Sequence, residues 1–409
     1  MKKYKLGEIL DVTRGASLSG EYYSTEGEYI RLTCGNFDYQ NNCFKPNASK
    51  DNLFYTGDFK AEFLMEKGDI ITPLTEQAIG LLGSTALIPE SGKYIQSQDI
   101  AKIVCKEELL DKGFAFYLIS SAIVKQQLSA AAQQTKIRHT SPDRIKDCTV
   151  WLPCLDEQKR IGRLLRTIDS KIELNRAINH NLEAMAKQLY DYWFVQFDFP
   201  NEKGKPYKSS GGAMVWNEEL KREIPDGWQS GLLEDFLRIK NGRDHKHLAE
   251  GLYPVYGSGG EMRRVTEYLY EGESVLMPRK GSLNNIMYVN EAFWTVDTMF
   301  YSEMKLSYCA KYIYYSIRDI DFTRLDSGTG VPSMTSSTLY SIKIITPQFD
   351  ILRKFDVIIS PLFAHMKKIV RQNAELTKQR DELLPLLMNG QASINYDLCV
   401  RFIILFYLV

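Results

Sequence analysis

Residues 161–193 read IGRLLRTIDSKIELNRAINHNLEAMAKQLYDYW, and residues 355–387 read FDVIISPLFAHMKKIVRQNAELTKQRDELLPLL. In both stretches apolar residues recur at alternating steps of four and three for more than four heptads. This spacing places them along one seam of a helix and is typical of a coiled coil. For either stretch alone, an ordinary amphipathic helix against a globular core is the alternative.

The two stretches match in register, which favours the coiled coil over that alternative. Asn179 and Asn373 are polar residues at corresponding seam positions, and a buried Asn there costs stability but fixes the register. Pro361 predicts either a kink in the second helix or a later start. The predicted seam consists of Ile161, Leu165, Ile168, Ile172, Asn175, Asn179, Leu182, Ala186, Leu189, Trp193, Phe355, Ile359, Leu362, Met366, Ile369, Asn373, Leu376, Arg380, Leu383 and Leu387.

The helices belong to a longer internal repeat, which indicates two copies of one structural unit. Pro153 and Pro347 close two similar apolar runs and lie 194 residues apart. Other pairs share this offset: Asp156 and Asp350, Arg160 and Lys354, Asn179 and Asn373, Leu182 and Leu376, Leu189 and Leu383. The segments 66–73 and 271–278 are also alike, at a slightly different offset.

Each copy is predicted to be a β-rich region followed by a long helix. At 1.5 Å per residue the first helix is about 50 Å long, which exceeds a DNA turn of about 34–36 Å. Two similar globular regions held apart by a stiff rod form a ruler. A helix over 112–132 and a polar linker are also expected. The predicted segments are 1–153 (first globular region), 154–199 (first helix), 200–224 (linker), 225–347 (second globular region), 348–390 (second helix) and 391–409 (atypical apolar tail).

Composition excludes several classes of protein. The chain has 409 residues, of which 44% are hydrophobic and 25% charged, so it is globular rather than disordered. Lys and Arg number 51, as do Asp and Glu, so the zero net charge argues against a polybasic coat but leaves local basic patches open. The seven cysteines form no C-x-x-C motif, which fits a reducing cytoplasm.

The two ends of the sequence carry no targeting signal that we recognise. The N-terminus lacks the apolar segment of a secretion signal. The last eight residues, 402–409, are all apolar, but a bilayer crossing needs about 20 residues. We therefore expect an unusual terminus or a docking segment rather than a membrane anchor, and a cytoplasmic protein.

Motifs for catalysis are weak. The sequence contains no P-loop, and its glycine loops lack the spacing of a dinucleotide fingerprint. Asp143 with Glu157 and Lys159 resembles a PD…E-x-K nuclease signature, but the repeat places Ile351 and Arg353 at the positions of Glu157 and Lys159. We interpret the pattern as coincidence, and we expect no catalytic residue, metal site or cofactor.

The remaining polar loops favour DNA recognition. They combine Arg, Lys, Asn, Gln, Ser and His, the side chains that contact phosphates and base edges. For each single residue, a solvated loop position is the competing interpretation. The candidate DNA-binding residues are Gln133, Gln134, Lys136, Arg138, His139, Arg243, Arg263, Arg264, Arg279, Lys280, Ser282 and Asn284. The loop 326–335 corresponds to the loop 133–141 in the repeat.

Together these features resemble the specificity subunit of a type I restriction–modification system over residues 1 to about 394. The local motifs are short: Lys5-Leu6-Gly7-Glu8-Ile9, the helix start from Leu152-Pro153 through Glu157-Gln158-Lys159-Arg160-Ile161, Ile168-Asp169-Ser170-Lys171-Ile172, and residues 380–391. Their order and the repeat make the match specific. The start of the second helix departs from the pattern, because it lacks the Glu-Gln pair.

The resemblance implies an α+β fold: two similar mixed α/β target recognition domains, residues 1–153 and 225–347, separated by two long antiparallel coiled-coil helices. It implies a non-catalytic subunit whose two domains read the halves of a bipartite asymmetric DNA site, while the helices set the spacer. The implied partners are double-stranded DNA, two methyltransferase subunits and the motor–nuclease subunits. The alternatives are a stand-alone nuclease or methyltransferase, or a coiled-coil scaffold.

Overall fold

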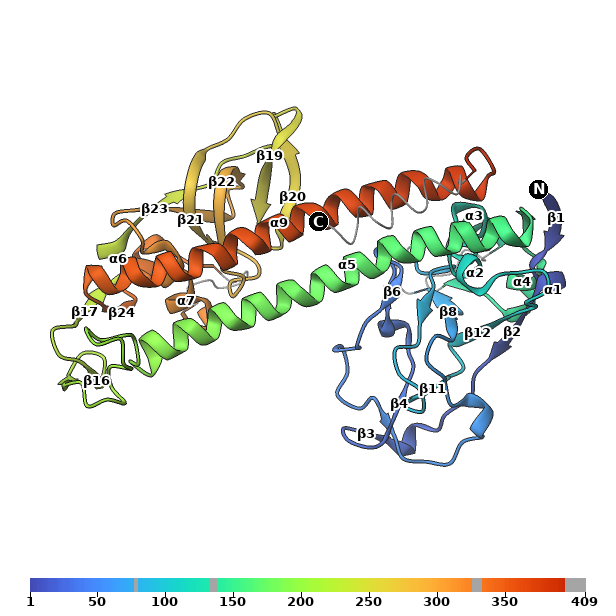
Figure 1. Cartoon of the computed structure of the whole chain (residues 1–409), viewed down its shortest axis with the longest axis horizontal. Coiled ribbons are helices and arrows are strands. Elements are labelled where there is room, and N and C mark those ends of the chain that lie inside the picture. Colours follow the sequence, from blue (N-terminus) through green and yellow to red (C-terminus); the bar gives the residue numbers. More distant parts are fainter. Residues whose placement is uncertain (77–79, 132–137, 326–332, 394–409) are drawn as a thin grey trace. The chain divides into compact units, whose positions relative to one another are not determined.

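The computed structural model describes residues 1–76, 80–131, 138–325 and 333–393 (Figure 1). The chain divides into two compact units: Met1–Asn175 together with the stretch from Arg371 onward, and Arg176–Val370. Each unit has its own large hydrophobic core. The apolar tail over 394–409 lies outside the described residues.

Two long helices contribute to both units. Helix α5 (Leu155–Tyr190) and helix α9 (Phe349–Met388) are the green and red ribbons of Figure 1. A π-helical turn, Asp191–Val195, follows α5 directly. The lengths confirm the two long helices that the heptad spacing predicts.

Within unit 1 the two helices run antiparallel. Asp169 of α5 pairs with Arg380 of α9, and six residues further along α5, Asn175 bonds to Asn373. As the residue number rises along α5, the number of the partner residue on α9 falls. Within unit 2 the direction is the same, since Asn179 bonds to Met366 and Trp193 packs against Phe355.

Helix α9 continues through Pro361, where a kink or a later start was expected. Pro361 cannot donate to the carbonyl of Val357, four residues earlier, and so one helix hydrogen bond is missing. Both residues lie on the exposed side of the helix, and Val357 is 64% exposed. Water can satisfy the free carbonyl there, and the helix need not end.

Unit 1 carries head 1, residues 1–152. One four-stranded sheet has the order β10-β8-β12-β2, a second has the order β11-β4-β7-β3, and β1-β14, β5-β6 and β9-β13 form pairs. The strands are β1 (Lys2–Lys5), β2 (Leu10–Arg14), β3 (Tyr23–Ser24), β4 (Tyr29–Arg31), β5 (Phe37–Asp38), β6 (Cys43–Phe44), β7 (Phe54–Tyr55), β8 (Ile70–Pro73), β9 (Thr75–Glu76), β10 (Ala86–Leu87), β11 (Tyr94–Ile95), β12 (Ile100–Cys105), β13 (Arg138–His139) and β14 (Thr149–Leu152). The helices are α1 (Leu6–Ile9), α2 (Lys112–Ile119), α3 (Ala122–Ala131) and α4 (Pro142–Asp147).

The single helix expected over 112–132 is two helices, α2 and α3, because the chain breaks at Ser120 and Ser121. The Ser120 hydroxyl donates to the Phe116 carbonyl, and the Ser121 hydroxyl donates to the Leu118 carbonyl at 2.6 Å. Such local bonds compete with the helical ladder, which explains the break.

Unit 2 carries head 2, residues 229–346. Its main sheet has six strands in the order β18-β23-β21-β22-β19-β20, and β17 pairs with β24. The strands are β17 (Gln229–Leu232), β18 (Leu237–Asn241), β19 (Glu250–Gly257), β20 (Gly260–Val265), β21 (Tyr270–Pro278), β22 (Met287–Thr295), β23 (Met299–Met304) and β24 (Lys343–Thr346). The helices are α6 (Leu233–Phe236), α7 (Ala310–Arg318) and α8 (Ser336–Tyr340).

The two heads share a topological core. In head 1 strand β12 lies between β8 and β2, and in head 2 strand β23 lies between β21 and β18. The first strand pairs antiparallel with the last in each head, β1 with β14 and β17 with β24. The repeat seen in the sequence therefore extends to strand order, and the α+β fold class is confirmed.

The stretch 200–224, expected as a linker, is folded in unit 2. Strands β15 (Met214–Asn217) and β16 (Arg222–Pro225) form an antiparallel hairpin. The Phe199 ring stacks on Tyr207 at 4.7 Å and on Trp228 at 4.9 Å between ring centroids. The Gly, Lys and Ser content of the stretch indicates a linker, and two of the three aromatic residues that pack it, Phe199 and Trp228, lie outside its ends.

Candidate nucleic-acid interface

In head 2, backbone hydrogen bonds join several strand ends and a loop into one rim. Arg243 N donates to Thr295 O at 2.8 Å, and Arg279 N donates to Thr298 O at 2.8 Å. Met334 N donates to Arg279 O at 2.8 Å, which fastens the loop before α8 to the end of β21. The head 2 rim comprises residues 241–243, 279–280, 295–299 and 333–335.

Head 1 has the same rim. Ala16 N donates to Gln96 O at 2.9 Å, Leu74 N donates to Asp99 O at 2.8 Å, and Thr140 N donates to Leu74 O at 2.9 Å. Each bond has its counterpart in head 2, although the sequence offset between counterparts changes from segment to segment. The head 1 rim comprises residues 14–16, 74–75, 96–100 and 139–141.

A glycine is required at one position of each rim. A Cβ atom on Gly15 would lie 2.3 Å from the Gln96 carbonyl oxygen, and one on Gly242 would lie 2.0 Å from the Val296 carbonyl oxygen. Backbone atoms cannot move aside as side chains can. Both glycines therefore let the strand end approach the opposite turn closely enough for the next residue to bond.

The loops predicted to bind DNA end in equivalent helix caps. The Ser141 hydroxyl accepts from Arg144 N at 3.3 Å and starts α4. The Thr335 hydroxyl accepts from Thr338 N at 3.1 Å and starts α8. Such caps fix where each loop stops, because they satisfy free backbone donors of the first helical turn.

Several predicted residues of head 2 gather at or beside the rim. Arg243, Arg279, Lys280 and Ser282 are all exposed. The Arg279 guanidinium lies 6.0 Å from the centroid of the Phe300 ring. Within the described ranges the three cations form no ion pair with a carboxylate. Their charges are therefore available to an anionic partner.

Asn284, which is exposed, has hydrogen-bond partners within head 2. Its side-chain amide donates to the Asp321 carboxylate at 3.2 Å, and its oxygen accepts from Phe322 N at 2.8 Å. The side chain thus holds the loop after β21 against the turn before residue 326. We interpret Asn284 as a support for the rim rather than a free reader.

Arg263 and Arg264 do not join the rim. Both lie on β20, at the far edge of the six-stranded sheet. Arg263 Nη2 donates to the Leu248 carbonyl at 2.6 Å, and Arg264 Nε pairs with Glu261 at 2.9 Å. These bonds stabilise the β19–β20 ribbon.

In head 1 the predicted loop is described only in part. Gln133, Gln134 and Lys136 lie outside the described residues. The backbone of Arg138 pairs with Glu76 in the β13–β9 ladder, and His139 pairs with Thr75. His139 is exposed. The counterpart in head 2 is the bridge between Lys280 and Ser333.

The predicted seam residues are placed on α5 and α9 at two levels of burial. Ile168, Ile172 and Leu376 form one apolar cluster of unit 1, with Leu383 against it. The buried seam residues are Ile161, Leu165, Ile168, Ile172, Asn175, Ala186, Trp193, Phe355, Ile359, Ile369, Leu376, Arg380 and Leu387. The half-buried ones are Asn179, Leu182, Leu189, Leu362, Met366, Asn373 and Leu383.

The hydrogen bonds of Gln158 give a structural role to the second residue of the Glu-Gln pair at the start of the first helix. Its side chain is 2% exposed, donates to the carbonyls of Leu109 and Pro153, and accepts from Asp111 N at 3.0 Å. It fixes α5 to the start of α2. The repeat position in α9 is Leu352, which is also 2% exposed and packs in an apolar core instead.

Two residues that hold the rim backbones in place were not among the residues predicted from the sequence. The Trp294 indole N–H donates to the Arg243 carbonyl at 2.9 Å and holds that residue's backbone. In head 1 the Gln96 side-chain amide, 1% exposed, donates to the carbonyls of Thr13 and Ile100. No local pattern marks a buried Gln, whereas a Trp near a strand end offers a weak signal.

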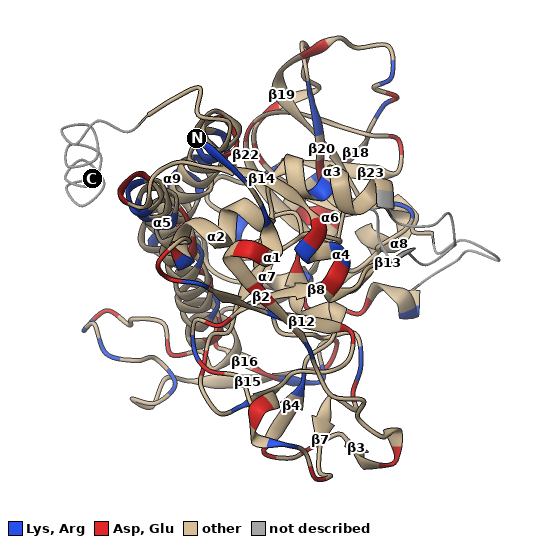
Figure 2. Cartoon of the chain, turned by 90° about the vertical axis from the view of Figure 1, so that its right-hand side faces the viewer, with Lys and Arg blue, Asp and Glu red and all other residues tan. Residues whose placement is uncertain are grey.

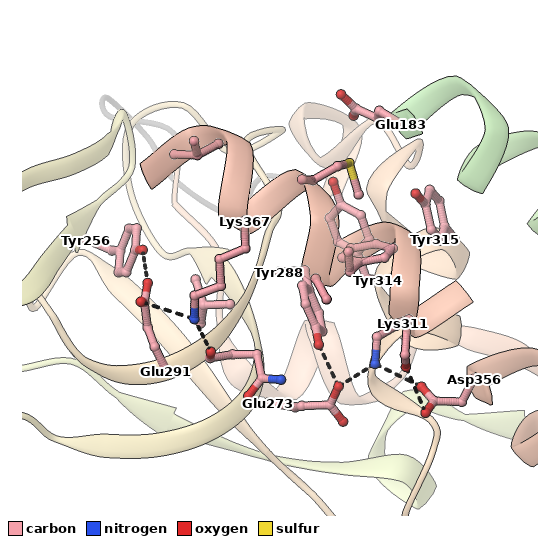
Figure 3. A pocket seen from close by; sticks show the side chains of 17 residues that line it. Glu183, Tyr256, Glu273, Tyr288, Glu291, Lys311, Tyr314, Tyr315, Asp356 and Lys367 are labelled. Carbon is pink, nitrogen blue, oxygen red and sulfur yellow. Dashed lines mark hydrogen bonds and ion pairs between the residues drawn. The ribbon is translucent and has the colours of Figure 1, made fainter. Parts of the chain in front are cut away.

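A cavity of about 620 Å³ lies elsewhere in unit 2, between head 2 and α9 (Figure 3). Lys311, 3% exposed, donates to Glu273 and to Asp356, and the Tyr288 hydroxyl donates to Glu273 at 2.5 Å. Burial, and then the bond to Glu273, raises the pKa of Tyr288 well above its usual range. Tyr288 therefore stays a proton donor, and the network ties the sheet to Asp356 of α9.

The described residues offer no group of three or more His, Cys, Asp or Glu side chains placed to hold a metal ion. Glu157, part of the nuclease-like pattern, pairs with Arg160 on its own helix. Positive and negative residues are interspersed over the elements in Figure 2. Among the helices that the structure describes, none has the length and apolar character that crossing a bilayer requires.

Comparison with known proteins gives consistent matches. A family model described as "Type I restriction modification DNA specificity domain" matches residues 1–184 and 225–378. The MjaIX specificity subunit of Methanocaldococcus jannaschii is 23% identical over 335 residues, 73% of either chain. The HindI specificity subunit of Haemophilus influenzae is 21% identical over 377 residues, covering 74% of this chain and 80% of the relative.

A solved structure extends the likeness to three dimensions. The S subunit of a type I restriction–modification system from M. genitalium aligns over 95% of this chain and 96% of its own, with a TM-score of 0.63 and 19% identity. The fold is therefore of the specificity-subunit class. The family match over both copies of the repeat shows that the chain belongs to the type I restriction–modification DNA specificity family.

This membership confirms the function class that the sequence predicts. The protein is a DNA sequence-specificity subunit of a type I restriction–modification system and a non-catalytic component of it. The alternatives, a stand-alone nuclease or methyltransferase and a plain scaffold, gain no support.

Proposed function

We propose that the two heads read the two halves of a bipartite, asymmetric site in double-stranded DNA through their rims. The single observation that carries this is the recurrence of one backbone framework, bond for bond, around residues 16, 74 and 140 and around residues 243, 279 and 334. Equal frameworks with different side chains suit two readers with different targets.

The contacts of head 2 come from Arg243, Arg279, Lys280 and Ser282, which are exposed at or beside the rim. Arg and Lys bind phosphates or guanine edges, and Ser accepts or donates to several bases. His139 and the loop 133–138 supply contacts of head 1. The seam of α5 and α9 fixes the helix register, and with it the spacer between half-sites.

The partners follow from the same assignment. Two methyltransferase subunits bind the chain, and motor–nuclease subunits join through them, since a specificity subunit without chemistry of its own acts through others. The segments 1–153 and 225–347 are the target recognition domains of this proposal, 154–199 and 348–390 are its helices, and 200–224 connects them.

The test is to map methylated motifs in cells that carry the chain with its methyltransferase partner. We expect a split motif with two unrelated halves and an unspecified gap. Exchange of residues 1–153 for those of another specificity subunit should change one half only. Uniform methylation, or one continuous motif, would contradict the proposal.

A second experiment tests the rim itself. Arg279→Ala with Lys280→Ala should weaken DNA binding by the assembled complex. The matched control is Lys203→Ala with Lys221→Ala, which removes two exposed cations of unit 2 that lie off the rim. Equal loss in both double variants would show that bulk charge, and not the rim, binds DNA.

A further inference from the structure

The two rims carry unequal charge at equivalent positions. The backbone bonds make Arg243 the counterpart of Ala16, since each donates across the same turn. By the same criterion Arg279 is the counterpart of Leu74, which is 2% exposed. Lys280 then corresponds to Thr75.

The charges on the remaining rim positions do not reverse this difference. In head 2 only Asp297, exposed in the turn after β22, opposes the three cations among the rim residues. In head 1 the rim residues include Arg14 and Asp99, whose charges cancel. The Nε atom of Arg14 also donates a hydrogen bond to the Gln98 carbonyl at 2.7 Å.

Phosphate contacts and base contacts obey different physics. Each neutralised phosphate releases counterions, and the logarithm of affinity falls by about 0.9 per tenfold rise in salt for each contact. Neutral hydrogen bonds to base edges supply specificity with little salt dependence. A rim whose three cations form no ion pair among the described residues, and a rim in which the charges of Arg14 and Asp99 cancel, therefore contribute differently to binding.

We propose that the rim of head 2 supplies more of the phosphate-binding, salt-dependent part of DNA affinity than the rim of head 1 does; the loop 133–138, beside the head 1 rim in the sequence, is not part of this comparison. The geometric basis is the placement of Arg243, Arg279 and Lys280 at rim positions that hold Ala16, Leu74 and Thr75 in head 1. The inference rests on the proposed function of the rims and assigns their division of labour.

The test measures binding of the assembled methyltransferase complex to a duplex with both half-sites scrambled, by fluorescence anisotropy over a range of salt. The triple variant Arg243→Ala, Arg279→Ala, Lys280→Ala should reduce the slope by about two to three. Arg14→Ala in head 1 should reduce it by about one at most. Circular dichroism and complex assembly check that each variant is folded.

A reciprocal variant tests the equivalence of positions. Ala16 bonds through its backbone and is only half-buried, and Ala16→Arg should therefore steepen the slope by about one. An unchanged slope in the triple variant, or a larger loss with Arg14→Ala, would overturn the inference. If either result were obtained while the wild-type complex still methylated a split motif, it would refute the division of labour but not the proposed function.

Discussion

Asn175 of α5 donates its side-chain amide to the Asn373 oxygen of α9 at 2.8 Å, and also to the Gln372 oxygen at 2.8 Å. Asn373 is thus satisfied across the seam by Asn175 rather than by its repeat counterpart, Asn179. The antiparallel direction explains this, because repeat-equivalent residues cannot face each other along the whole length of two antiparallel helices.

The two seam asparagines of α5 should respond oppositely to substitution. Asn175→Ala removes two hydrogen bonds and should lower the free energy of unfolding by about 1–3 kcal/mol. Asn179 reaches only the Met366 carbonyl at 3.5 Å, and its oxygen is buried without a partner among the described residues. Asn179→Leu should therefore raise stability by about 1 kcal/mol. Urea denaturation measures both, and shifts of the same sign would contradict this account.

The ion pair between Arg380 and Asp169, 3.0 Å apart, is a second structural determinant of unit 1. The side chains are 8% and 11% exposed, and the Tyr117 hydroxyl also donates to Asp169. Arg380→Met leaves a buried carboxylate without its partner and should cost about 3–5 kcal/mol. Asp169→Leu in the same chain should recover most of that loss. Arg353→Met, which breaks an exposed pair with Asp350, is the control and should cost at most about 1 kcal/mol.

Gly162 should not tolerate a methyl group although it lies within α5. Glycine to alanine in a helix normally gains about 1 kcal/mol. Here the new Cβ would lie 2.7 Å from Phe114 N and 2.9 Å from the Gly113 carbonyl carbon of α2. Overpacking against backbone costs about 1–3 kcal/mol or more, so the clash outweighs the gain. Gly162→Ala should lower the thermal midpoint, whereas Ser170→Ala on the exposed side of α5 should leave it nearly unchanged.

Cysteine labelling should separate the described thiols by burial. Burial raises the pKa of Cys309 to about 12, and that of Cys148 to about 11, whereas Cys154 is exposed. Only the thiolate reacts, and a pKa three units higher reduces it about a thousandfold. At pH 8 iodoacetamide should therefore modify Cys154 well before Cys309, as mass spectrometry of the peptides can show. In urea the two should react alike, and early labelling of Cys309 in the native chain would contradict the packing.

The sequence predicts the long helices well because heptad spacing is local. The buried face of α5 can be predicted from apolar residues three and four positions apart. The seam residues Ile161, Leu165, Ile168 and Ile172 are buried as that spacing requires. Which Asn meets Asn373 is not local, since it depends on where two distant segments align. The repeat also identified corresponding loops, which the structure places at equivalent caps, Ser141 and Thr335.

The rim was predictable only in its chemistry. Arg279 and Lys280 stand out as an exposed basic pair beside Gly281, and both lie on the rim. Arg263 and Arg264 give the same signal but lie on an edge strand, because strand order is set by pairings that no single segment encodes. Gly15 is needed for a contact with Gln96, 81 positions away, and nothing adjacent in the chain reveals it.

The rims are built from main-chain bonds, and every residue except proline has the atoms to make them. Natural selection can therefore exchange the outward side chains at positions such as 16 and 243 one at a time, and the inherited scaffold survives each exchange. Gly15 and Gly242 are the exceptions, because any larger residue there would collide with the opposite turn. If the rims read DNA as proposed, new target sequences are then reachable by small evolutionary steps that leave the folding of the heads untouched.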